Sequence, residues 1–424
     1  MDTSSLFRPG SAQFVADPYP AYAELRRTGR AHHHPATDQW LVTHHADVSA
    51  LLRDRRLGRT YLHRFTHEEF GRTPPPAAHE PFHTLNDQGI LDLEAPDHTR
   101  IRRLVAQAFT PRRVEELAPV VQRIAHGLVT DFVAAGGGDL LADVAEPLPV
   151  TVIAEMLGIP EADRHLLRPW SADICGMYEL NPSEDTATRA VRAAVEFSEY
   201  LRGLIRERRR SPASAPGPGP GPGPAPAPTS APDLISALIA VHDTDGTRLT
   251  EQEMISTCVL LLNAGHEATV NTTANGWWTL FRHPEQLALL RAEPGLLLGA
   301  IEELLRYDTP LQLFERWVLD DIEVGGTVIP RGSEVALLFG SANRDPAVFD
   351  DPDTFDVRRP AAANRHLSFG AGIHYCLGAP LARLELAASF SLLLREAPRM
   401  RLLAEPRWKP GYVIRGLAAL EVEV

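Results

Sequence analysis

The sequence predicts a mostly α-helical protein with a minor β part. Three observations support this fold class. Apolar residues recur at helical spacing over most of the chain, one helical pattern runs for about 33 residues, and the β-like pieces are short. We expect these elements to form a single domain over residues 1–424.

Composition excludes several classes of protein. The chain is 44% hydrophobic and 23% charged, which is enough apolar material for a large buried core. Its 42 Lys and Arg residues against 55 Asp and Glu residues give a formal net charge of −13. An acidic chain binds nucleic acids and anionic membranes poorly unless its basic residues cluster. We therefore expect neither a nucleic-acid nor a membrane partner.

The cysteines and the N-terminal residues indicate a cytoplasmic protein. Cys175, Cys258 and Cys376 are odd in number and far apart, so they predict no disulfide framework. Residues 1–10 lack the basic region and apolar run of a secretory signal. No stretch of about 18 uncharged apolar residues occurs, so we expect no membrane span.

The shorter elements follow from apolar spacing and from punctuation by Pro and Gly. Pro18 and Gly29 bound the first helix, and Gly136–Gly138 ends the third. The predicted helices are residues 18–29, 97–109 and 112–135, and the predicted strands are residues 40–43, 322–329 and 413–424.

The longest predicted helix spans about residues 250–283. Thr250 and Glu253 have capping-box spacing at its start, and His283-Pro284 ends it. At 1.5 Å per residue, this helix is about 50 Å long. Because apolar residues lie on most of its sides, we expect it to be buried through the centre of the domain.

The segment 211–232 has almost nothing to bury. It contains nine prolines and alternates Gly and Pro four times from Gly217. We expect a flexible or polyproline-like loop inserted between two helices, rather than a domain boundary.

The strongest chemical signal is the loop from Phe369 to Gly378, in which Cys376 follows a glycine-rich turn and precedes a helix. The glycines let backbone N–H groups turn toward the sulfur, and the helix presents its positive end to the same atom. Both effects favour a thiolate, which can act as a nucleophile, a redox thiol or a metal ligand. A nucleophile needs a base, for which only His374 is near in sequence, and a redox thiol needs a resolving Cys, which is absent nearby.

This loop resembles the heme-binding signature of the cytochrome P450 family, Phe-x-x-Gly-x-x-x-Cys-x-Gly, at every defined position. The resemblance, to the soluble bacterial type, extends from about Asp17 to the C-terminus. It implies the cytochrome P450 fold, with heme b between the long central helix and the Cys loop. Cys376 is then the axial thiolate ligand of the iron, and Phe369, Gly370 and Gly378 contact the heme.

A second motif supports the resemblance. Glu303 and Arg306 stand at i, i+3 on a predicted helix, which by itself is typical of a solvated surface pair. Placed before the Cys loop, they resemble the Glu-x-x-Arg motif of the family. The resemblance implies that this pair and a further Arg hold the loop. Arg359 is the expected third member, and the adjacent Arg358 is the alternative.

The middle of the long helix resembles a third family pattern. Ala264 and Gly265 would let a flat molecule approach the backbone, and Glu267 could deliver protons. The segment matches the family pattern Ala/Gly-Gly-x-Asp/Glu-Thr at four of five positions, with Ala268 in place of the Thr. Thr269 is rotated by about 100° from that position, so we expect it to face elsewhere. The catalytic candidates are Ala264, Gly265 and Glu267, together with Thr269, whose hydroxyl could complete the proton path if it were reoriented.

A fourth group of residues is suited to binding carboxylates. His98 and Arg102 stand at i, i+4 on one face of a predicted helix, so both can reach one anion. The resemblance implies that these two residues bind the heme propionates together with Arg316 and His374.

The function that the resemblance implies is that of a heme-thiolate monooxygenase, an oxidoreductase using O₂ and electrons from a ferredoxin and a ferredoxin reductase. We expect a monomer that hydroxylates or epoxidises a lipophilic small molecule, such as a natural-product intermediate. The resemblance places the pocket in segments 58–92, 170–200, 260–263 and 311–314. Its expected lining includes Leu260, Asn263, Leu311, Leu313 and Phe314.

Two other functions are compatible with the same resemblance. A peroxide-driven oxidant is suggested by Ala268, although the retained Glu267 argues against it. A non-catalytic recruitment domain of the same fold should have lost Cys376 or the Glu303–Arg306 pair, and this chain has lost neither.

Two histidine patterns favour ordinary surface residues over metal sites. His79-Glu80-Pro81-Phe82-His83 satisfies the zinc-protease pattern, but Pro81 lies inside the helix that this chemistry needs. His32–His34 and His44-His45 have no carboxylate or Cys clustered with them in the sequence.

Overall fold

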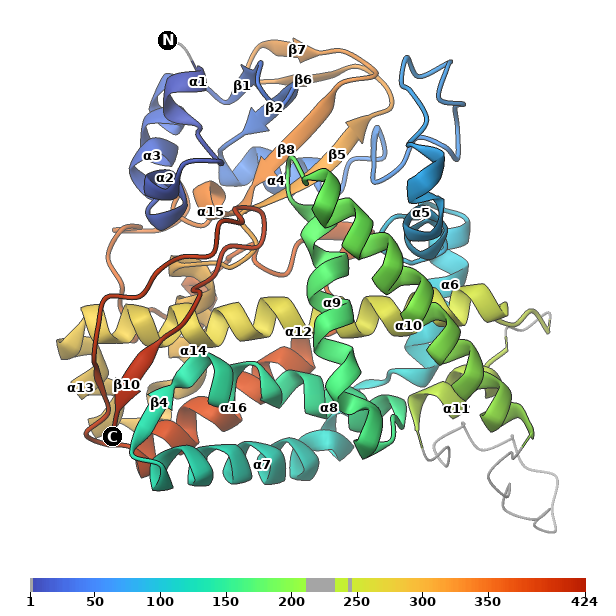
Figure 1. Cartoon of the computed structure of the whole chain (residues 1–424). Coiled ribbons are helices and arrows are strands. Elements are labelled where there is room, and N and C mark those ends of the chain that lie inside the picture. The colour runs from blue at the N-terminus through green and yellow to red at the C-terminus, as the bar shows by residue number, and fades with distance from the viewer. Residues whose placement is uncertain (1–2, 211–232, 243–245) are drawn as a thin grey trace, which may run out of the picture.

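The computed structural model describes residues 3–210, 233–242 and 246–424. Helices make up most of it, and the strands form sheets of five, three and two strands within these ranges (Figure 1). This confirms the prediction of a mostly α-helical fold with a minor β part. The predicted Pro-rich loop, residues 211–232, lies outside the described residues.

The helices follow one another along the whole chain. They are α1 (Thr3–Leu6), α2 (Ala12–Ala16), α3 (Tyr19–Thr28), α4 (His45–Leu51), α5 (Glu80–Asp87), α6 (Asp97–Ala108), α7 (Pro111–Ala134), α8 (Pro147–Leu157), α9 (Leu167–Cys175), α10 (Glu184–Arg210), α11 (Leu234–Ala240), α12 (Glu251–Arg282), α13 (Pro284–Ala292), α14 (Leu297–Tyr307), α15 (Phe339–Ala342) and α16 (Ala379–Glu396).

The largest sheet joins segments from both ends of the chain in the order β1-β2-β8-β5-β3. β2 and β8 are parallel, and the other neighbouring strands are antiparallel. The strands are β1 (Ala31–His34), β2 (Gln39–Val42), β3 (Leu57–Gly58), β4 (Gly137–Asp139), β5 (Leu313–Val318), β6 (Ile322–Val324), β7 (Thr327–Ile329), β8 (Glu334–Leu338), β9 (Arg401–Leu402) and β10 (Glu421–Glu423).

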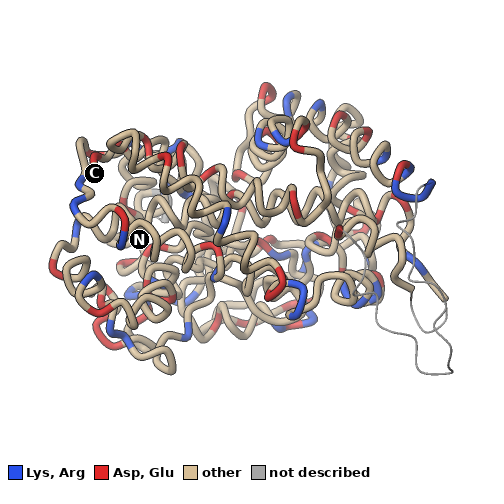
Figure 2. Tube along the Cα trace, turned by 90° about the horizontal axis from the view of Figure 1, so that it is seen from below, with Lys and Arg blue, Asp and Glu red and all other residues tan. Residues whose placement is uncertain are grey.

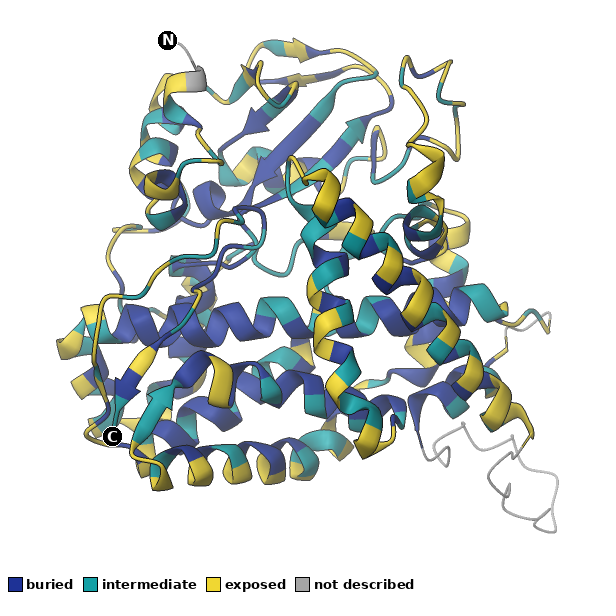
Figure 3. Ribbon diagram, viewed as in Figure 1, coloured by how far each residue is buried: buried dark blue, intermediate teal, exposed yellow. Residues whose placement is uncertain are grey.

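The longest helix, α12, crosses the middle of the molecule (Figure 1). Thr250 accepts a hydrogen bond from the backbone N–H of Glu253, and the Glu253 carboxylate accepts one from the N–H of Thr250. The predicted capping box is therefore confirmed. α12 packs against α8, α9, α10 and α16, and most of its residues are buried (Figure 3).

Most of the predicted elements are present with nearly the expected bounds. Residues 322–329 form the hairpin of β6 and β7, in which Gly325 and Gly326 supply the two positive φ angles of the turn. The segment 413–424 is less regular than expected, because only Glu421–Glu423 is a strand and the rest makes isolated bridges.

Basic and acidic residues are interspersed along most of the chain trace (Figure 2). Two arginines near the start of α6 and α7 are engaged with carboxylates. Arg100 pairs with Glu253, and Arg112 pairs with Glu116. Within the described ranges, no helix is both long and apolar enough to cross a bilayer.

Candidate heme-thiolate site

Cys376 lies at the end of a tight loop that leads into α16. The loop turns at Gly370 and Gly372, whose φ angles are 67° and 70°. A Cβ at Gly372 would also come within 2.4 Å of the Leu52 carbonyl oxygen, so only glycine fits there. The Cys376 N–H donates to the Phe369 carbonyl at 3.0 Å, which fixes the cysteine in the loop.

Cys376 is half-buried, and the groups around its sulfur stabilise a thiolate. Burial raises the pKa of Cys376, and the backbone N–H groups of Gly378 and Ala379 act in the opposite direction, as does Arg102. A half-buried sulfur with N–H groups pointing at it suits a ligand whose negative charge is neutralised by a bound metal.

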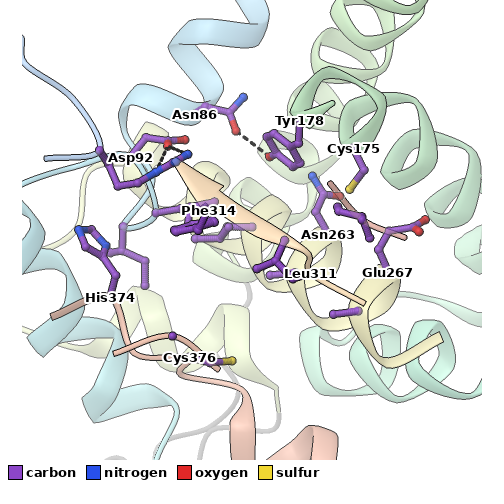
Figure 4. Close-up of a pocket in the computed structure, with 18 of the residues that line it drawn as sticks. Asn86, Asp92, Cys175, Tyr178, Asn263, Glu267, Leu311, Phe314, His374 and Cys376 are labelled. Carbon is purple, nitrogen blue, oxygen red and sulfur yellow. Dashed lines mark hydrogen bonds and ion pairs between the residues drawn. The ribbon is translucent and has the colours of Figure 1, made fainter. Parts of the chain in front are cut away.

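A single large cavity, of about 950 Å³, joins Cys376 to the central helix (Figure 4). α12 contributes Ala264, Gly265, Glu267, Ala268 and Thr269 to its wall. Ala264 is exposed although it lies in the middle of the most buried helix, because the cavity opens directly over it. The helix therefore presents a small side chain where a flat group would pack.

Gly265 has a second reason to be glycine. A Cβ there would lie 2.5 Å from the Cδ1 atom of Ile153, which belongs to α8. The glycine thus lets α8 approach α12 closely, in addition to keeping the cavity open. The sequence pattern alone indicated only that Gly265 keeps the cavity open; it did not indicate the contact with α8.

Thr269 lines the cavity, which corrects the expectation that it faces elsewhere. The cavity curves around α12 far enough to include Ala268, Thr269 and Thr272. Thr269 is 5% exposed, so its side chain borders the cavity while being packed on its other sides. The acid and the hydroxyl therefore both lie at the cavity despite their unusual spacing.

Glu267 lies where α12 meets α9. His266 Nδ1 is 3.7 Å from Glu267 Oε1, and burial raises the pKa of the neighbouring Cys175, which the Glu267 carboxylate raises further. In Figure 4 the carboxylate lies at the side of the cavity away from His374. Nearby, Glu146 and Arg168 form an ion pair at 2.5 Å. Glu267 thus lies between the cavity wall and a charged cluster that contains Glu146 and Arg168.

The predicted carboxylate-binding residues come together from three separate segments. The rings of His98 and His374 have centroids 4.5 Å apart, and Arg102 donates to the Tyr375 carbonyl at 2.5 Å. Arg102, Arg316 and His374 line the cavity, whereas His98 is buried behind them. The structure therefore groups the four residues but places only three of them at the cavity surface.

Several donors in this group lack partners within the described part of the chain. Neither ring nitrogen of His98 has a hydrogen-bond partner, and neither does Arg316 Nη2. Burial, with Arg59 nearby, lowers the pKa of Arg316 to about 9, and burial lowers that of His98 to about 4. Buried donors without acceptors are costly, so this cluster fits the carboxylates of a bound group. The residues present therefore fit a heme with propionates.

Two charged residues at this cluster were not predicted from the sequence. Arg59 pairs with Asp92 at 2.8 Å, and its backbone N–H donates to Glu94. Glu94 also lies 3.2 Å from the Nε2 atom of His374. Arg59 lies within the segment 58–92 that was expected at the pocket, and Glu94 lies just beyond it, but this irregular sequence has no periodicity that would single out either residue.

Glu303, Arg306 and Arg359 lie behind the Cys loop, and none of them lines the cavity. Arg306 donates to both Glu303 carboxylate oxygens, at 2.7 and 2.8 Å, and both side chains are fully buried. Arg359 donates to the same carboxylate at 3.0 Å, whereas Arg358 pairs with Glu293 on the surface. Arg306 also donates to three backbone carbonyls, those of residues 343, 352 and 354.

The neighbouring Glu302 forms a second link that was not predicted. It accepts hydrogen bonds from Arg383 of α16 at 2.6 and 2.9 Å and lies 3.0 Å from His366. Although burial acts to raise the pKa of Glu302, Arg383 and His366 lower it to about 2. Arg383 also lies over the Phe369 ring at 4.4 Å, so this link ties α14 to both ends of the Cys loop.

The five residues expected in the substrate pocket all line the cavity, namely Leu260, Asn263, Leu311, Leu313 and Phe314. Phe369, Gly370 and Gly378 line it as well. Of the segment 170–200, however, only residues 175 and 177–179 reach it, and α10 does not. Other lining residues were missed, including Ile153 and Met156 of α8, Ile414, and Glu385 of α16.

The histidine patterns do not form metal sites in the described parts of the chain, where no group of three or more suitable ligands occurs. The zinc-protease pattern is helical after all, because α5 starts at Glu80 with Pro81 in its first turn, where a backbone N–H is not needed. His34 is buried rather than on the surface and contacts Thr37 at 2.9 Å.

The comparisons with known proteins agree with this geometry. The family model Cytochrome P450 matches residues 173–396. The cytochrome P450 monooxygenase PikC of Streptomyces venezuelae is 41% identical over 418 residues, covering 96% of this chain and 91% of that protein. The chain belongs to the cytochrome P450 family and is an enzyme of its monooxygenase class, whose members carry a heme-thiolate centre.

Further relatives cover nearly the whole chain. The vitamin D(3) 25-hydroxylase of Pseudonocardia autotrophica is 36% identical, with 97% of this chain and 95% of that protein covered. Among solved structures, P450BioI in complex with an acyl carrier protein ligated to hexadec-9Z-enoic acid superposes with a TM-score of 0.85. That chain is 35% identical, and the match covers 98% of this chain and 100% of that one.

Proposed function

We propose that this protein is a heme-thiolate monooxygenase that uses O₂ and electrons from a redox partner to hydroxylate or epoxidise a lipophilic natural-product intermediate. One observation carries the proposal. The half-buried Cys376, with the N–H groups of Gly378 and Ala379 directed at its sulfur, shares a cavity of about 950 Å³ with Ala264 of the central helix.

The residues present would hold heme b with Cys376 as the axial thiolate. When bound, a heme with a thiolate ligand activates O₂ for insertion of one oxygen atom into a C–H bond or a double bond. Arg102, Arg316 and His374 would bind its carboxylates from the cavity wall, with His98 behind them. Glu303, Arg306 and Arg359 would keep the Cys loop in place.

Glu267 and Thr269 are the groups that would move protons within the cavity. The Glu267 carboxylate can exchange protons with the charged cluster beside α9, and the Thr269 hydroxyl can hold a proton or an ordered water on the cavity side. Ala264 and Gly265 would keep the cavity open above the thiolate.

The wall chemistry supports a lipophilic substrate, because most of the distal lining is apolar. The names of several relatives support a natural-product intermediate as the substrate. They include nocardicin C N-oxygenase, 6-deoxyerythronolide B hydroxylase and a cytochrome P450 of polyketide biosynthesis. A ferredoxin and a ferredoxin reductase as electron donors, a cytoplasmic location, a single domain and a monomeric state are further parts of this proposal.

The test replaces the thiolate. We expect Cys376→Ser to abolish the thiolate-dependent Soret band of the reduced CO complex. Cys258→Ser is the matched control, because Cys258 is a buried free thiol that does not line the cavity. Survival of the band in Cys376→Ser, or its loss in Cys258→Ser, would contradict the assignment.

A peroxide-driven oxidant is the second candidate, because Ala268 lacks the hydroxyl of the family pattern. The presence of Glu267 and Thr269 at the cavity favours the reductant-driven reaction. Turnover with ferredoxin, its reductase and NADPH should therefore exceed turnover with hydrogen peroxide. A non-catalytic role has no support in the chain, since Cys376 and its supporting residues are all retained.

A further inference from the structure

Three polar side chains stand together in the otherwise apolar distal part of the cavity. Asn86 comes from α5, Tyr178 from the turn after α9, and Asn263 from α12. All three line the cavity, and they lie across it from Cys376 (Figure 4). We call this group the polar anchor.

The hydrogen-bond directions within the polar anchor are fixed. Asn86 Nδ2 donates to the Phe82 carbonyl at 2.8 Å, so Asn86 Oδ1 is the atom that faces Tyr178. The Tyr178 hydroxyl donates to that oxygen at 3.0 Å. Because a phenol has only one proton, the Tyr178 oxygen can then only accept from any further group.

Asn263 has unused hydrogen-bonding capacity. It is 2% exposed, and neither its Oδ1 nor its Nδ2 atom has a hydrogen-bond partner in the described part of the chain. Burial raises the pKa of Tyr178 well above its ordinary value, whereas the Asn263 amide, directed at the Tyr178 oxygen without reaching full hydrogen-bond geometry, acts to lower it. A buried amide without partners costs free energy, which a bound polar group would offset.

The main cavity is the larger of two cavities that Asn263 lines, so such a group reaches Asn263 from the main cavity. The adjoining cavity that Asn86, Tyr178 and Asn263 also line measures about 10 Å³, which is room for at most one water molecule. The apolar neighbours Leu260 and Leu261 lie on the same side of α12, so the polar anchor is a small polar spot on an apolar wall.

The charges beside the polar anchor disfavour an anionic group. Asp92 borders the small cavity with Tyr178 and is paired with Arg59. Asp87, which also lines the main cavity, has no ion pair among the described residues, and burial together with Asp92 raises its pKa to about 6. A carboxylate would therefore meet an acceptor oxygen on Tyr178 and net negative charge around it.

We propose that Asn263 and Tyr178 bind an uncharged hydroxyl or carboxamide group of the lipophilic substrate and so determine which molecules are oriented for oxidation. Such a group donates to the Tyr178 oxygen or Asn263 Oδ1 and accepts from Asn263 Nδ2. This inference rests on the proposed function, because it names the class of substrate that the same cavity takes.

The experiment measures binding rather than turnover. Holoprotein is dialysed to equilibrium against decanol, decyl methyl ether or decanoate, and the bound fraction is quantified by mass spectrometry. We expect decanol to bind about tenfold more tightly than the ether, which cannot donate, and more tightly than decanoate. In Asn263→Leu, the ratio of the two dissociation constants for decanol and the ether should fall severalfold, because only the Tyr178 oxygen remains to accept from decanol.

The control variant is Asn271→Leu. Asn271 is a fully buried amide on the same helix, its two polar atoms also lack partners among the described residues, and it does not line the cavity. We expect it to keep the wild-type ratio. Comparing ratios between variants cancels the different hydrophobicity of the two probes.

The possible results distinguish a failure of the polar anchor from a failure of the proposed heme-thiolate function. A ratio near one in the wild type, or an unchanged ratio in Asn263→Leu, would overturn the polar anchor and indicate an amide satisfied by water. If Asn263→Leu does not fold, the wild-type ratio and Tyr178→Phe, which should lower it, decide instead. Loss of the thiolate-dependent CO band in the wild-type protein would contradict the proposed function itself, whereas a normal band with an unaltered ratio contradicts only the anchor.

Discussion

The hydroxyl of Thr269 stands one residue after the position where the family pattern has a threonine. The structure places Thr269 at the cavity, and its hydrogen bonding differs from that of the neighbouring threonines. The Thr272 hydroxyl donates to the Ala268 carbonyl and that of Thr273 donates to the Thr269 carbonyl. Within the described residues, the Thr269 hydroxyl donates to no backbone carbonyl. This hydroxyl can therefore bind a water molecule or a substrate group in the cavity.

We therefore expect Thr269→Ala to lower the product formed per NADPH consumed by about tenfold. The loss is smaller than that of a sole proton donor, because an ordered water can replace part of the relay. Thr269→Ser should retain most of the coupling, and Ala268→Thr in the Thr269→Ala background should restore it. Thr273→Ala is the control, because Thr273 is buried one turn away and does not line the cavity.

Unchanged coupling in Thr269→Ala would show that the hydroxyl comes from elsewhere, such as a hydroxyl group of the substrate. In that case Ala268→Thr should leave the native reaction unchanged or impair it, and improve coupling only with a substrate analogue that lacks the hydroxyl.

At the scale of elements, the Cys loop is held by α14 through one carboxylate. Glu303 accepts from Arg306, from Arg359 and from the backbone N–H of Asp356, and it is fully buried. Arg306 in turn binds backbone carbonyls of the segment that precedes the Cys loop. Removal of Glu303 would leave two buried guanidinium groups without a counterion.

We expect Glu303→Ala to lower the free energy of unfolding by about 3–5 kcal/mol and to yield protein poor in heme. The measurements are urea unfolding and the ratio of heme to protein absorbance. Glu285→Ala, on the exposed face of α13, is the control and should change neither. A stable Glu303→Ala variant with full heme and only a raised KM would show that Glu303 serves the substrate rather than the loop.

The elements differ in how well the sequence predicts them, and the difference is physical. α12 carries its own start and stop signals, so its bounds follow from residues 250, 253 and 283–284. The five-stranded sheet could not be predicted, because β2 pairs with β8, whose residues are almost 300 positions away, and local spacing contains no information on such pairing. α5 was missed because Pro81 suggested a break, although a proline in the first turn is compatible with a helix.

The same division holds for the site. Residues inside short motifs, such as Cys376 and Glu303, were predicted because the spacing of neighbouring residues in the motif specifies the local backbone and side-chain arrangement. Ile153 and Ile414 were missed because they reach the cavity only through the packing of distant segments. The exposure of a side chain to the cavity is likewise a tertiary property, which is why Thr269 was expected to face elsewhere.

At the scale of the whole molecule, the cavity is walled by segments from nearly the entire chain. Residues from Leu52 to Ile414 line it, and the central helix α12 shares its wall with α8 and α16. Folding therefore buries some of the polar side chains that line the cavity. Glu385 of α16 is the clearest case, since it is 2% exposed, lines the cavity, and its Oε1 has no partner among the described residues.

Burial raises the pKa of Glu385 from an ordinary value of 4.5 to about 8, so the native protein holds this group as the neutral acid at neutral pH. Below pH 4.5 the folded and unfolded states are both protonated, and the group does not weaken folding. As the pH rises from 4.5 to 8, the unfolded chain releases the proton while the native chain keeps it. Stability then falls by up to about 1.4 kcal/mol per pH unit.

Glu385→Gln keeps the shape of the side chain and removes its titration. We therefore expect the free energy of unfolding of the wild type to fall relative to that of Glu385→Gln between pH 5.5 and 7.5 by about 1–3 kcal/mol. The measurement is urea unfolding of both proteins at matched heme content, at several pH values in this range. Glu396→Gln, at the exposed end of the same helix, should run parallel to the wild type. If the wild type and Glu385→Gln run parallel instead, Glu385 is ionised in the native protein and must have a cationic partner when the cavity is filled.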